Sequence, residues 1–213
     1  MSIFAIGDIH GYPDKLQSLV NKLPLTSDDR LIFLGDYVDR GPYSRSVMDM
    51  LLEIKETHNT VFIRGNHDDM LIDYINGCKV YDRNMWLRYG GMESLLSYGY
   101  DSAEPGELII PADHLRLIEE SKYYHLETGF IFVHSGLKPG VPLEQNQRKD
   151  LLWTRREFIE SRYRWPEGIV VFGHTPFQVP LIEDNKIGID TGCGYGGPLT
   201  AVRLPEIEFF QAE

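Results

Sequence analysis

The chain has few of the features that mark disulfide-rich, membrane-spanning or secreted proteins. It contains only two cysteines, Cys78 and Cys193, which are too few and too far apart for a disulfide framework. It has no apolar run near the roughly 18 residues that a membrane span needs. Its first residues, MSIFAIGD, lack the basic start and the small-residue cleavage site of a signal peptide. We therefore expect a cytoplasmic protein.

The chain also lacks an excess of positive charge. Its formal net charge is -11, which argues against broad binding to nucleic acids or to anionic membranes. Two divalent cations would bring this value to -7, that is -11 plus 4. An acidic chain is therefore still compatible with a phosphate site in which metal ions and a few arginines supply the local positive charge.

The length and composition predict one ordinary globular domain. The 213 residues, of which 42% are apolar, are enough to bury a sizeable core. Strand and helix patterns alternate along the first third of the chain, and Ser44 is expected to cap the second helix. The predicted order is strand 3–6, helix 13–22, strand 31–34, helix 44–57 and strand 60–63.

The rest of the chain is predicted to hold a helical excursion and a second group of strands. A helix begins at Asp68, and the segment of about 68–121, with Gly90 and Gly91 in its middle, is expected to form a small helical cap. A helix is also predicted at 151–163. Further strands are predicted at 122–127, 130–133, 169–172, 179–183, 187–189, 199–204 and 206–210.

Five predicted strands end in side chains that can bind a metal ion. The apolar run LIFL at 31–34 ends at Gly35 and is typical of a buried strand. Asp36 follows it, and an open α/β sheet places its ligands at such strand ends. The same pattern occurs at four other strands and supplies Asp8 and His10, Asn66 and His67, His134, and His174.

The spacing and chemistry of these side chains favour a shared metal site. Asp8 and His10 leave the same face of the chain if the backbone between them is extended. Asp36 follows Asp8 by 28 residues and Asn66 follows Asp36 by 30, each the length of one βαβ unit. Carboxylate, imidazole and amide oxygen suit Mn, Fe or Zn. Asp36 could bridge two ions, because a carboxylate has two oxygens.

Five motifs in this order resemble the PPP-type metallophosphatases: GDIHG, GDYVDRG, RGNHD, HSG and GHTP. That group includes the serine/threonine phosphatases of eukaryotes, their bacterial and phage relatives, and the diadenosine tetraphosphate hydrolases. The match runs from Ile6 to Gly197. It implies an α/β, calcineurin-like metallophosphoesterase fold, with two mixed β-sheets packed face to face, flanking helices and the small cap, in a single domain of residues 1–213.

The resemblance also implies a dinuclear metal centre. A water or hydroxide between the two ions would be the nucleophile, since metal binding lowers the pKa of water towards neutrality. We expect two divalent ions, Mn²⁺ first, with Fe or Zn as the alternatives. The implied ligands are Asp8 and His10 for one ion, Asp36 as the bridge, and Asn66, His134 and His174 for the other.

Four further residues receive catalytic or substrate-binding roles from the resemblance. His67 would be the general acid that protonates the leaving oxygen, and Asp39 would orient its imidazole. Arg40 and Arg155, the latter in LLWTRREF, would hold the phosphate, because guanidinium forks match phosphate oxygens.

We expect hydrolysis of phosphate monoesters, first of all phosphoserine or phosphothreonine in proteins, with small phosphorylated molecules as other substrates. The alternative is a diadenosine polyphosphate (Ap4A) hydrolase, which would need an aromatic face for adenine, as Trp86 or Tyr89 of the cap could offer. An inactive binding scaffold is a third reading, against which all the implied site residues are present. A regulatory subunit is not expected, since the C-terminal region that binds one in the larger eukaryotic members is missing.

Several residues near these motifs have a structural interpretation. Arg64 is expected to pair with a site acid, Asp68 and Asp69 to offset a helix dipole, and Cys193 to be a packed residue with no activating partner. Trp86, Tyr89 and the two glycines after them form either a lid or a packed helical corner. Surface or structural positions are expected for His58, His114, His125, Arg156, Arg162 and Arg164.

Overall fold

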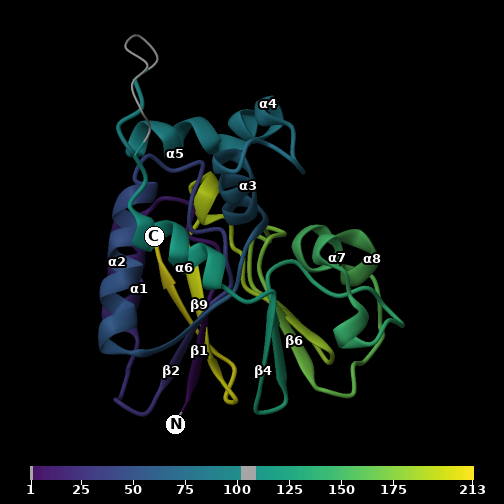
Figure 1. The fold of residues 1–213 in the computed structure, drawn as a ribbon. Helices are drawn as coiled ribbons and strands as arrows, with labels where there is room; N and C mark the ends of the chain where they lie inside the picture. The colour runs from purple at the N-terminus through teal and green to yellow at the C-terminus, as the bar shows by residue number, and fades with distance from the viewer. Residues whose placement is uncertain (1, 102–108) are drawn as a thin grey trace.

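The computed structural model describes residues 2–101 and 109–213, which form two five-stranded β-sheets with helices outside them (Figure 1). The first sheet has the order β10-β9-β1-β2-β3. Strands β1, β2 and β3 are parallel to one another, β9 is antiparallel to β1, and β10 is antiparallel to β9. The bounds are β1 Ile3–Ile6, β2 Arg30–Phe33, β3 Asn59–Phe62, β9 Leu199–Leu204 and β10 Glu208–Ala212.

The second sheet has the order β4-β5-β6-β8-β7. Strands β5, β6 and β8 are parallel, and an antiparallel strand lies at each edge. The bounds are β4 Tyr124–Glu127, β5 Phe130–Val133, β6 Ile169–Phe172, β7 Leu181–Glu183 and β8 Lys186–Gly188. Each sheet is therefore mixed, as the resemblance implied.

Alternation along the strands explains why the two sheets pack face to face. In β1, Ile3 and Ala5 belong to a buried cluster shared with Phe132 and Val171 of the second sheet. The intervening residues of β1 point the other way, into a cluster formed with the flanking helices. A strand with apolar side chains on both faces must be covered on both faces. The two sheets therefore form the central layers of the molecule.

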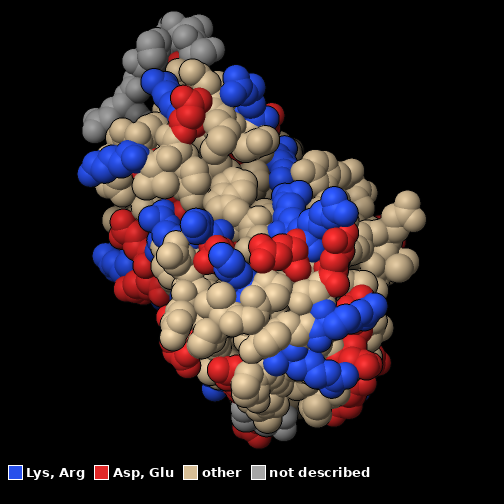
Figure 2. Space-filling view, turned by 90° about the vertical axis from the view of Figure 1, so that its right-hand side faces the viewer, with Lys and Arg blue, Asp and Glu red and all other residues tan. Residues whose placement is uncertain are grey.

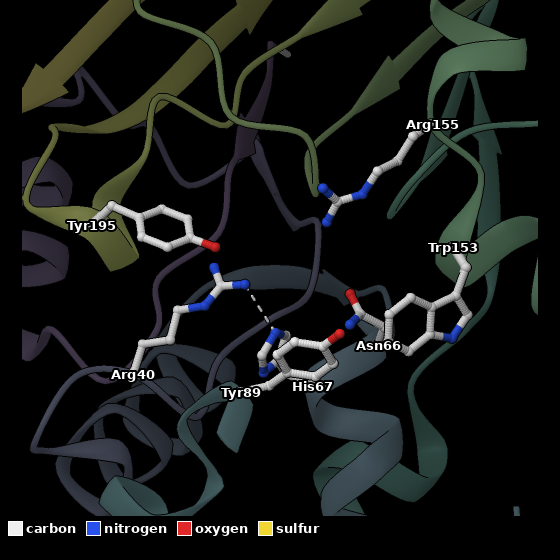
Figure 3. Close-up of a pocket in the computed structure, with 7 residues that line it drawn as sticks. All are labelled: Arg40, Asn66, His67, Tyr89, Trp153, Arg155 and Tyr195. Atoms are coloured by element: carbon white, nitrogen blue, oxygen red, sulfur yellow. Dashed lines mark hydrogen bonds between the residues drawn. The ribbon is translucent and has the colours of Figure 1, made fainter. Parts of the chain in front are cut away.

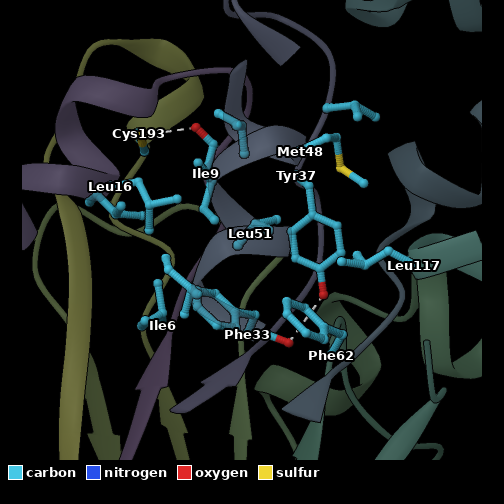
Figure 4. Close-up of a cluster of buried hydrophobic side chains, with 14 of the residues drawn as sticks. Ile6, Ile9, Leu16, Phe33, Tyr37, Met48, Leu51, Phe62, Leu117 and Cys193 are labelled. Carbon is cyan, nitrogen blue, oxygen red and sulfur yellow. Dashed lines mark hydrogen bonds between the residues drawn. The ribbon is translucent and has the colours of Figure 1, made fainter. Parts of the chain in front are cut away.

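Helices cover the outer faces of both sheets. Figure 4 shows Leu16 of α1 (Pro13–Lys22) and Leu51 of α2 (Ser44–Thr57) among buried residues of the first sheet. On the second sheet, α7 (Arg148–Trp153) and α8 (Arg156–Ile159) contribute Leu151 and Phe158 to the outer cluster. No helix among the described residues is long and apolar enough to cross a membrane.

The predicted cap consists of helices that come between β3 and β4 in the sequence; Figure 1 shows α3, α4 and α5 above the sheets, whereas α6 lies lower, level with the strands. Residues 102–108 of the predicted cap lie outside the described residues. The described helices of this segment are α3 Asn66–Ile75, α4 Arg83–Trp86, a π-helix at Leu87–Gly91, α5 Met92–Ser97 and α6 Ala112–Glu120.

Three local predictions were wrong. Ser44 is the first residue of α2 rather than its cap, and its hydroxyl accepts a hydrogen bond from the backbone of Asp39 instead. The predicted strand 122–127 is divided, because Lys122 forms an isolated bridge with Ile63 while β4 begins only at Tyr124. The predicted helix 151–163 is two short helices, α7 and α8, with an extended residue between them at Thr154.

Candidate active site

The predicted metal ligands converge at the carboxyl ends of the parallel strands. All six are buried, with at most 4% of their surface exposed. Parallel neighbours end at the same sheet edge, so side chains far apart in the sequence meet there. Asp8 and His10 follow β1, Asp36 follows β2, Asn66 begins α3 after β3, His134 follows β5, and His174 follows β6.

Tight left-handed turns direct these side chains inward. The φ angles are 51° at His10, 52° at Asp36 and 63° at His174, so the backbone at His10 is not extended as expected. Such angles cost about 1–3 kcal/mol for residues other than glycine and gather at functional sites. The first two turns are joined, because the backbone N–H of His10 donates to the carbonyl of Asp36 at 2.8 Å.

The N-terminus of α3 is locked against the Asp36 turn. A Cβ at Gly65 would lie 2.1 Å from the Oδ1 of Asp36, so only glycine fits there. The Asp68 carboxylate accepts from the backbone N–H of Gly65, Asp36 and Tyr37 at 2.8–2.9 Å. Asp68 therefore caps its helix, as expected, and also fixes the Asp36 loop. Burial and the charge of Asp36 raise the pKa of Asp68 to about 7.

Two imidazoles present their Nε2 atoms to Asp36. The Nδ1 of His10 lies 2.9 Å from the carbonyl oxygen of Val38, and the Nδ1 of His134 lies 2.9 Å from that of Leu34. Each Nδ1–H donates to its carbonyl, which leaves the Nε2 lone pair for a metal ion. The Nε2 of His10 is 3.4 Å from Oδ2 of Asp36, and the Nε2 of His134 is 3.4 Å from Oδ1.

The donor atoms fit two metal ions that share Asp36. The described residues form two groups of donor atoms, and in each the atoms lie within 4.8 Å of one another. Carboxylate and imidazole donors in such groups suit Mn, Fe or Zn. The Asp8 carboxylate lies 4.0 Å from His10 Nε2, and the Asn66 oxygen lies 2.9 Å from His134 Nε2. The groups are His10, Asp36 and His67, and Asp36, His134 and His174.

Buried negative charge gathers around the same point. Burial raises the pKa of Asp8 well above its usual value, and Asp190 and Asp36 add to the effect. Burial also raises the pKa of Asp190 to about 6. Burial opposes ionisation of Asp36 as well, but the nearby imidazoles, His134 first, and the guanidinium of Arg40 outweigh it and keep its pKa low. Divalent cations would offset the repulsion among these three acids.

His67 is held by a network that centres on Asp39. Its Nδ1 donates to Oδ2 of Asp39 at 2.7 Å, and the indole Nε1–H of Trp86 donates to the same oxygen at 2.8 Å. The hydroxyl of Ser94 donates to Oδ1 at 2.7 Å. Burial lowers the pKa of His67, but Asp36 and Asp39 outweigh it, so that the pKa is raised. The network fixes the ring and favours its protonated form.

The two predicted phosphate-binding arginines contact the imidazoles. Arg40 lies within 2.7 Å of His10 Nε2 and 3.0 Å of His67 Nε2, through Nη1 and Nη2 respectively. Arg155 donates through Nε to Nε2 of His174 at 2.9 Å. Arg155 occupies the break between α7 and α8, with φ of -131° and ψ of -97°. The break that the sequence did not predict is therefore what turns this side chain towards the site.

A central pocket of about 260 Å³ opens over these groups (Figure 3). Two arginines and three aromatic side chains contribute to its lining, and Figure 3 shows Arg40 and Arg155 on different sides of the space. In Figure 2, Lys and Arg side chains gather across the middle of one face, below the cap, with acidic side chains beside them. The lining residues are Arg40, Asn66, His67, Tyr89, Trp153, Arg155 and Tyr195.

The glycine pair of the cap is a packed corner, and Tyr89 beside it faces the pocket. Gly90 has φ of 107°, and its carbonyl accepts from the backbone N–H of Arg40 at 3.2 Å. A Cβ at Gly91 would lie 2.4 Å from the ring of Trp86. Trp86 is only 1% exposed and offers no free face, whereas Tyr89 is 50% exposed. Of the two predicted aromatic faces, only Tyr89 is available.

Sequence reasoning missed three residues of the site, Ser94, Asp190 and Tyr195, and missed the contact of a fourth, Trp86, with Asp39. Ser94 and Trp86 serve Asp39 from the cap, 55 and 47 residues further along the chain, with no motif to mark them. Asp190 and Tyr195 belong to the glycine-rich turn DTGCGYGG, of which only Cys193 was considered. That turn follows a strand, like the five predicted site loops, and this position was the available signal.

The remaining polar residues have structural partners. Arg64 donates to the carbonyls of Ile118 and Glu119 at the end of α6 and lies 3.5 Å from Asp69. Asp69 does more than offset the helix dipole, because its carboxylate also accepts a hydrogen bond from Tyr81 and pairs with Arg148. Other residues with an expected structural role contact side chains outside the site: His114 (Asp49 and Tyr98), His125 (Glu127), Arg156 (Glu160), Arg162 (Glu183) and Arg164 (Asp184).

Known proteins resemble this chain along most of its length. Residues 1–209 match the family described as calcineurin-like phosphoesterase. A relative from Anoxybacillus flavithermus, named bis(5'-nucleosyl)-tetraphosphatase PrpE [asymmetrical], is 31% identical over 229 residues, which cover 95% of this chain and 90% of the relative. A relative with the same name from a Geobacillus species is 33% identical over 236 residues, covering 98% and 92%.

Solved structures share the fold. A crystal structure of a protein provisionally assigned as a diadenosine tetraphosphatase superposes with a TM-score of 0.77 at 22% identity. The superposition covers 99% of this chain and 92% of that chain. The two mixed sheets described above are thus an arrangement already known among phosphoesterases.

Proposed function

Because the chain belongs to the calcineurin-like phosphoesterase family, we propose that it hydrolyses dinucleoside polyphosphates and cuts a four-phosphate chain asymmetrically. The names of the PrpE relatives, which are 31% and 33% identical over nearly the whole chain, support this substrate class. They favour it over the phosphoserine and phosphothreonine substrates that the motifs first suggested. The proposal therefore adopts the alternative reading of the sequence.

The observation that carries the proposal is the aromatic rim of the central pocket. Tyr89, Trp153 and Tyr195 surround the two arginines, and Tyr195 is 67% exposed. A phosphoserine peptide needs only the phosphate-binding groups, whereas a nucleotide also needs flat faces on which its bases can stack. The sequence offered Trp86 and Tyr89 as possible faces, and the pocket has Tyr89 together with Trp153 and Tyr195.

The six buried ligands would hold two divalent cations around Asp36. Bound cations would supply Lewis-acid polarisation of a phosphoryl oxygen and a nucleophile from water at neutral pH. The imidazoles of His10 and His134 already point their Nε2 atoms at Asp36 because backbone carbonyls hold their Nδ1–H groups. The chain thus orients its donor atoms in advance, which favours binding of the cations.

The residues around the pocket would bind the phosphate chain and protonate the leaving group. Arg40 and Arg155 would exchange their imidazole partners for phosphate oxygens, to which guanidinium groups bind with two parallel hydrogen bonds. His67, whose proton-bearing Nδ1 is held by Asp39 at 2.7 Å, would donate a proton from Nε2 to the leaving phosphate oxygen. Arg40 donates to that nitrogen in the structure, so its transfer to the phosphate would free Nε2 to carry the proton.

A substrate comparison with product analysis tests the proposal. Diadenosine tetraphosphate and a phosphoserine peptide are assayed with Mn²⁺ in one buffer, and the nucleotide products are separated by chromatography. We expect kcat/KM for the dinucleotide to exceed that for the peptide by more than tenfold, with AMP and ATP in equal amounts. The variant His67→Asn, prepared identically, controls for contaminating hydrolases.

Two results would overturn the proposal. A kcat/KM for the peptide that matches or exceeds that for the dinucleotide would return the protein to the phosphoprotein reading. Formation of two ADP molecules would retain the substrate class but contradict the asymmetric cut.

A further inference from the structure

Two further cavities adjoin the central pocket, and Tyr195 lines all three. We call the first the neutral cavity; it measures about 500 Å³. Two turns line it: one carries Phe177 and Gln178, and the other carries Thr191 and Tyr195. We call the second the cationic cavity; it measures about 300 Å³. Its lining includes Arg40, Arg88, Tyr89, Glu93 and Tyr195.

The volumes indicate that a dinucleotide cannot be accommodated in the central pocket alone. Sites for small molecules measure about 300–1,000 Å³, and the central pocket, at about 260 Å³, falls below that range. Part of that space must take the reacting phosphate. The two nucleosides of the substrate therefore need neighbouring space, and the two cavities that share Tyr195 supply it.

The charges of the two cavities differ in a way that matches an asymmetric cut. All described residues that line the neutral cavity are uncharged, whereas the cationic cavity has the guanidinium groups of Arg40 and Arg88. A cut that leaves one phosphate on one nucleoside and three on the other places two extra phosphates on one side of the reacting centre. Those phosphates need positive partners, whereas a base and ribose do not.

We infer that the neutral cavity holds the nucleoside that keeps one phosphate, and that the cationic cavity receives the nucleoside that keeps three. This inference rests on the proposed function. It assigns a direction to the substrate across the site. Arg88 binds the longer phosphate arm, and Tyr89 beside it offers a face for the distant base.

Tyr195 divides the two nucleosides. The guanidinium of Arg40 lies over its ring, 4.4 Å from the ring centre, and Figure 3 shows the Tyr195 hydroxyl directed into the central pocket beside Arg40. The ring is nevertheless 67% exposed. Its exposed part offers a base the stacking surface that is sequence-tolerant in nucleotide sites. Gln178, which is exposed in the neutral cavity, can both donate to and accept from a base edge.

Binding of the two products to matched variants tests the assignment. AMP, ATP and inorganic phosphate are titrated by calorimetry into the full-length protein loaded with Mn²⁺. The neutral cavity is altered by Gln178→Ala and the cationic cavity by Arg88→Ala, since each residue lines one of the two cavities. A second pair, Tyr195→Ala and Tyr195→Phe, separates stacking from the hydroxyl.

We expect opposite selectivity from the first two variants. Gln178→Ala should weaken AMP about 3- to 10-fold and leave ATP within twofold, as one lost hydrogen bond predicts. Arg88→Ala should weaken ATP about 3- to 10-fold and leave AMP within twofold. Tyr195→Ala should weaken AMP about 5- to 100-fold, and Tyr195→Phe should restore it. Inorganic phosphate should bind Gln178→Ala and Arg88→Ala as it binds the parent, because neither residue lines the central pocket.

The inference and the proposed function fail in different ways. If diadenosine tetraphosphate is cleaved to AMP and ATP but both cavity variants weaken the two products equally, or with the reverse selectivity, the direction is wrong. If neither product binds more tightly than inorganic phosphate, the cavities do not take nucleosides and the inference falls. If the products bind as expected but the dinucleotide is not cleaved, the proposed function fails alone.

Discussion

Asp36 is the residue on which both predicted metal positions depend. Its two carboxylate oxygens face different imidazoles, with His10 Nε2 at 3.4 Å from one and His134 Nε2 at 3.4 Å from the other. Asp36 also belongs to both groups of donor atoms. A single ion would leave one of these groups unused, so the geometry favours a pair of ions about 3.5–4 Å apart.

Metal content measured by elemental analysis tests this arrangement. We expect two Mn²⁺ per chain in the parent protein at saturation, and fewer than one in Asp36→Asn, since loss of the bridging charge weakens both positions. His134→Gln is the matched comparison, because it removes one donor from one group and should leave one ion bound. Saturation of the parent protein at a single ion would contradict the shared carboxylate.

Trp86 would act as a positioning residue for the proposed proton donor His67, because the indole N–H of Trp86 and Nδ1 of His67 both donate to Asp39. Trp86→Phe keeps the buried ring and removes the 2.8 Å hydrogen bond to Oδ2 of Asp39. We expect kcat to fall roughly 10-fold, because His67 is then held less well for proton donation. The loss should shrink with p-nitrophenyl phosphate, whose leaving group needs little protonation.

The dependence on the leaving group separates positioning from folding. His67→Asn should show the same dependence with a larger loss of kcat, about 10²–10⁴-fold. A loss of kcat in Trp86→Phe that is equal for good and poor leaving groups would mean that Trp86 supports the fold of the cap and not the orientation of His67.

Residue types at strand ends could be predicted from the sequence, whereas their partners could not. Asp36 and His174 follow short apolar runs, and that local pattern is enough to place them at a sheet edge. Trp86 and Ser94 reach Asp39 from the cap over 47 and 55 residues of chain. No local pattern encodes such a contact, because it depends on how the cap packs on the loops.

At the scale of elements, strands and long helices were predicted better than breaks. The helix at Pro13–Lys22 and the strand at Phe130–Val133 were confirmed, and the turn before this strand has positive φ at both Thr128 (53°) and Gly129 (79°). The break at Arg155 was missed because apolar spacing continues across it into α8. Tertiary contacts of Arg155 override helix propensity at that point.

One buried carboxylate ties the cap to α7. Asp69 is fully buried and accepts hydrogen bonds from the side chains of Tyr81 and Arg148. The hydroxyl of Tyr81 in turn accepts from the indole of Trp153, a wall of the central pocket, at 3.2 Å. The position of this wall therefore depends on Asp69, although that residue lines none of the pockets discussed above.

Asp69→Asn should lower the free energy of unfolding by about 2–3 kcal/mol, because a buried ion pair loses one of its charges. The value is below that for a fully buried pair because Arg148 is partly exposed and water screens its charge. Denaturant unfolding measures it. Glu160→Gln is the matched control, because its partner Arg156 is 86% exposed and the pair should contribute about 0.5 kcal/mol or less. Equal effects of the two substitutions would show that Asp69 does not link the cap to α7.

At the scale of the whole molecule, the site joins the two sheets. Asp8, Asp36 and Asn66 follow strands of the first sheet, whereas His134 and His174 follow strands of the second. The backbone N–H of His174 also donates to both oxygens of Asp8, at 3.1 and 3.0 Å. Cations held by these ligands would cross-link the layers, so metal binding should contribute to the stability of the fold as well as to catalysis.

Thermal unfolding with Mn²⁺ and with a chelator should reveal this contribution. At a Mn²⁺ concentration 100 times Kd, binding at one site stabilises the folded protein by about 2.7 kcal/mol. For a chain of this size, that raises Tm by about 5–10 °C. Asp36→Asn serves as the control and should show little or no rise, because its cation positions are weakened.

The rise in Tm should be larger at pH 7.5 than at pH 5, for a reason that lies in the buried acids. The pKa of Asp190 is about 6 in the folded protein, against about 3.9 in the unfolded chain. The folded state therefore holds this proton more tightly, and the metal-free protein loses stability as pH rises from about 4 to 6. Cations favour the ionised acid and remove that loss, whereas protons compete with them at pH 5. An equal rise at both pH values would show that the cations do not act through these acids.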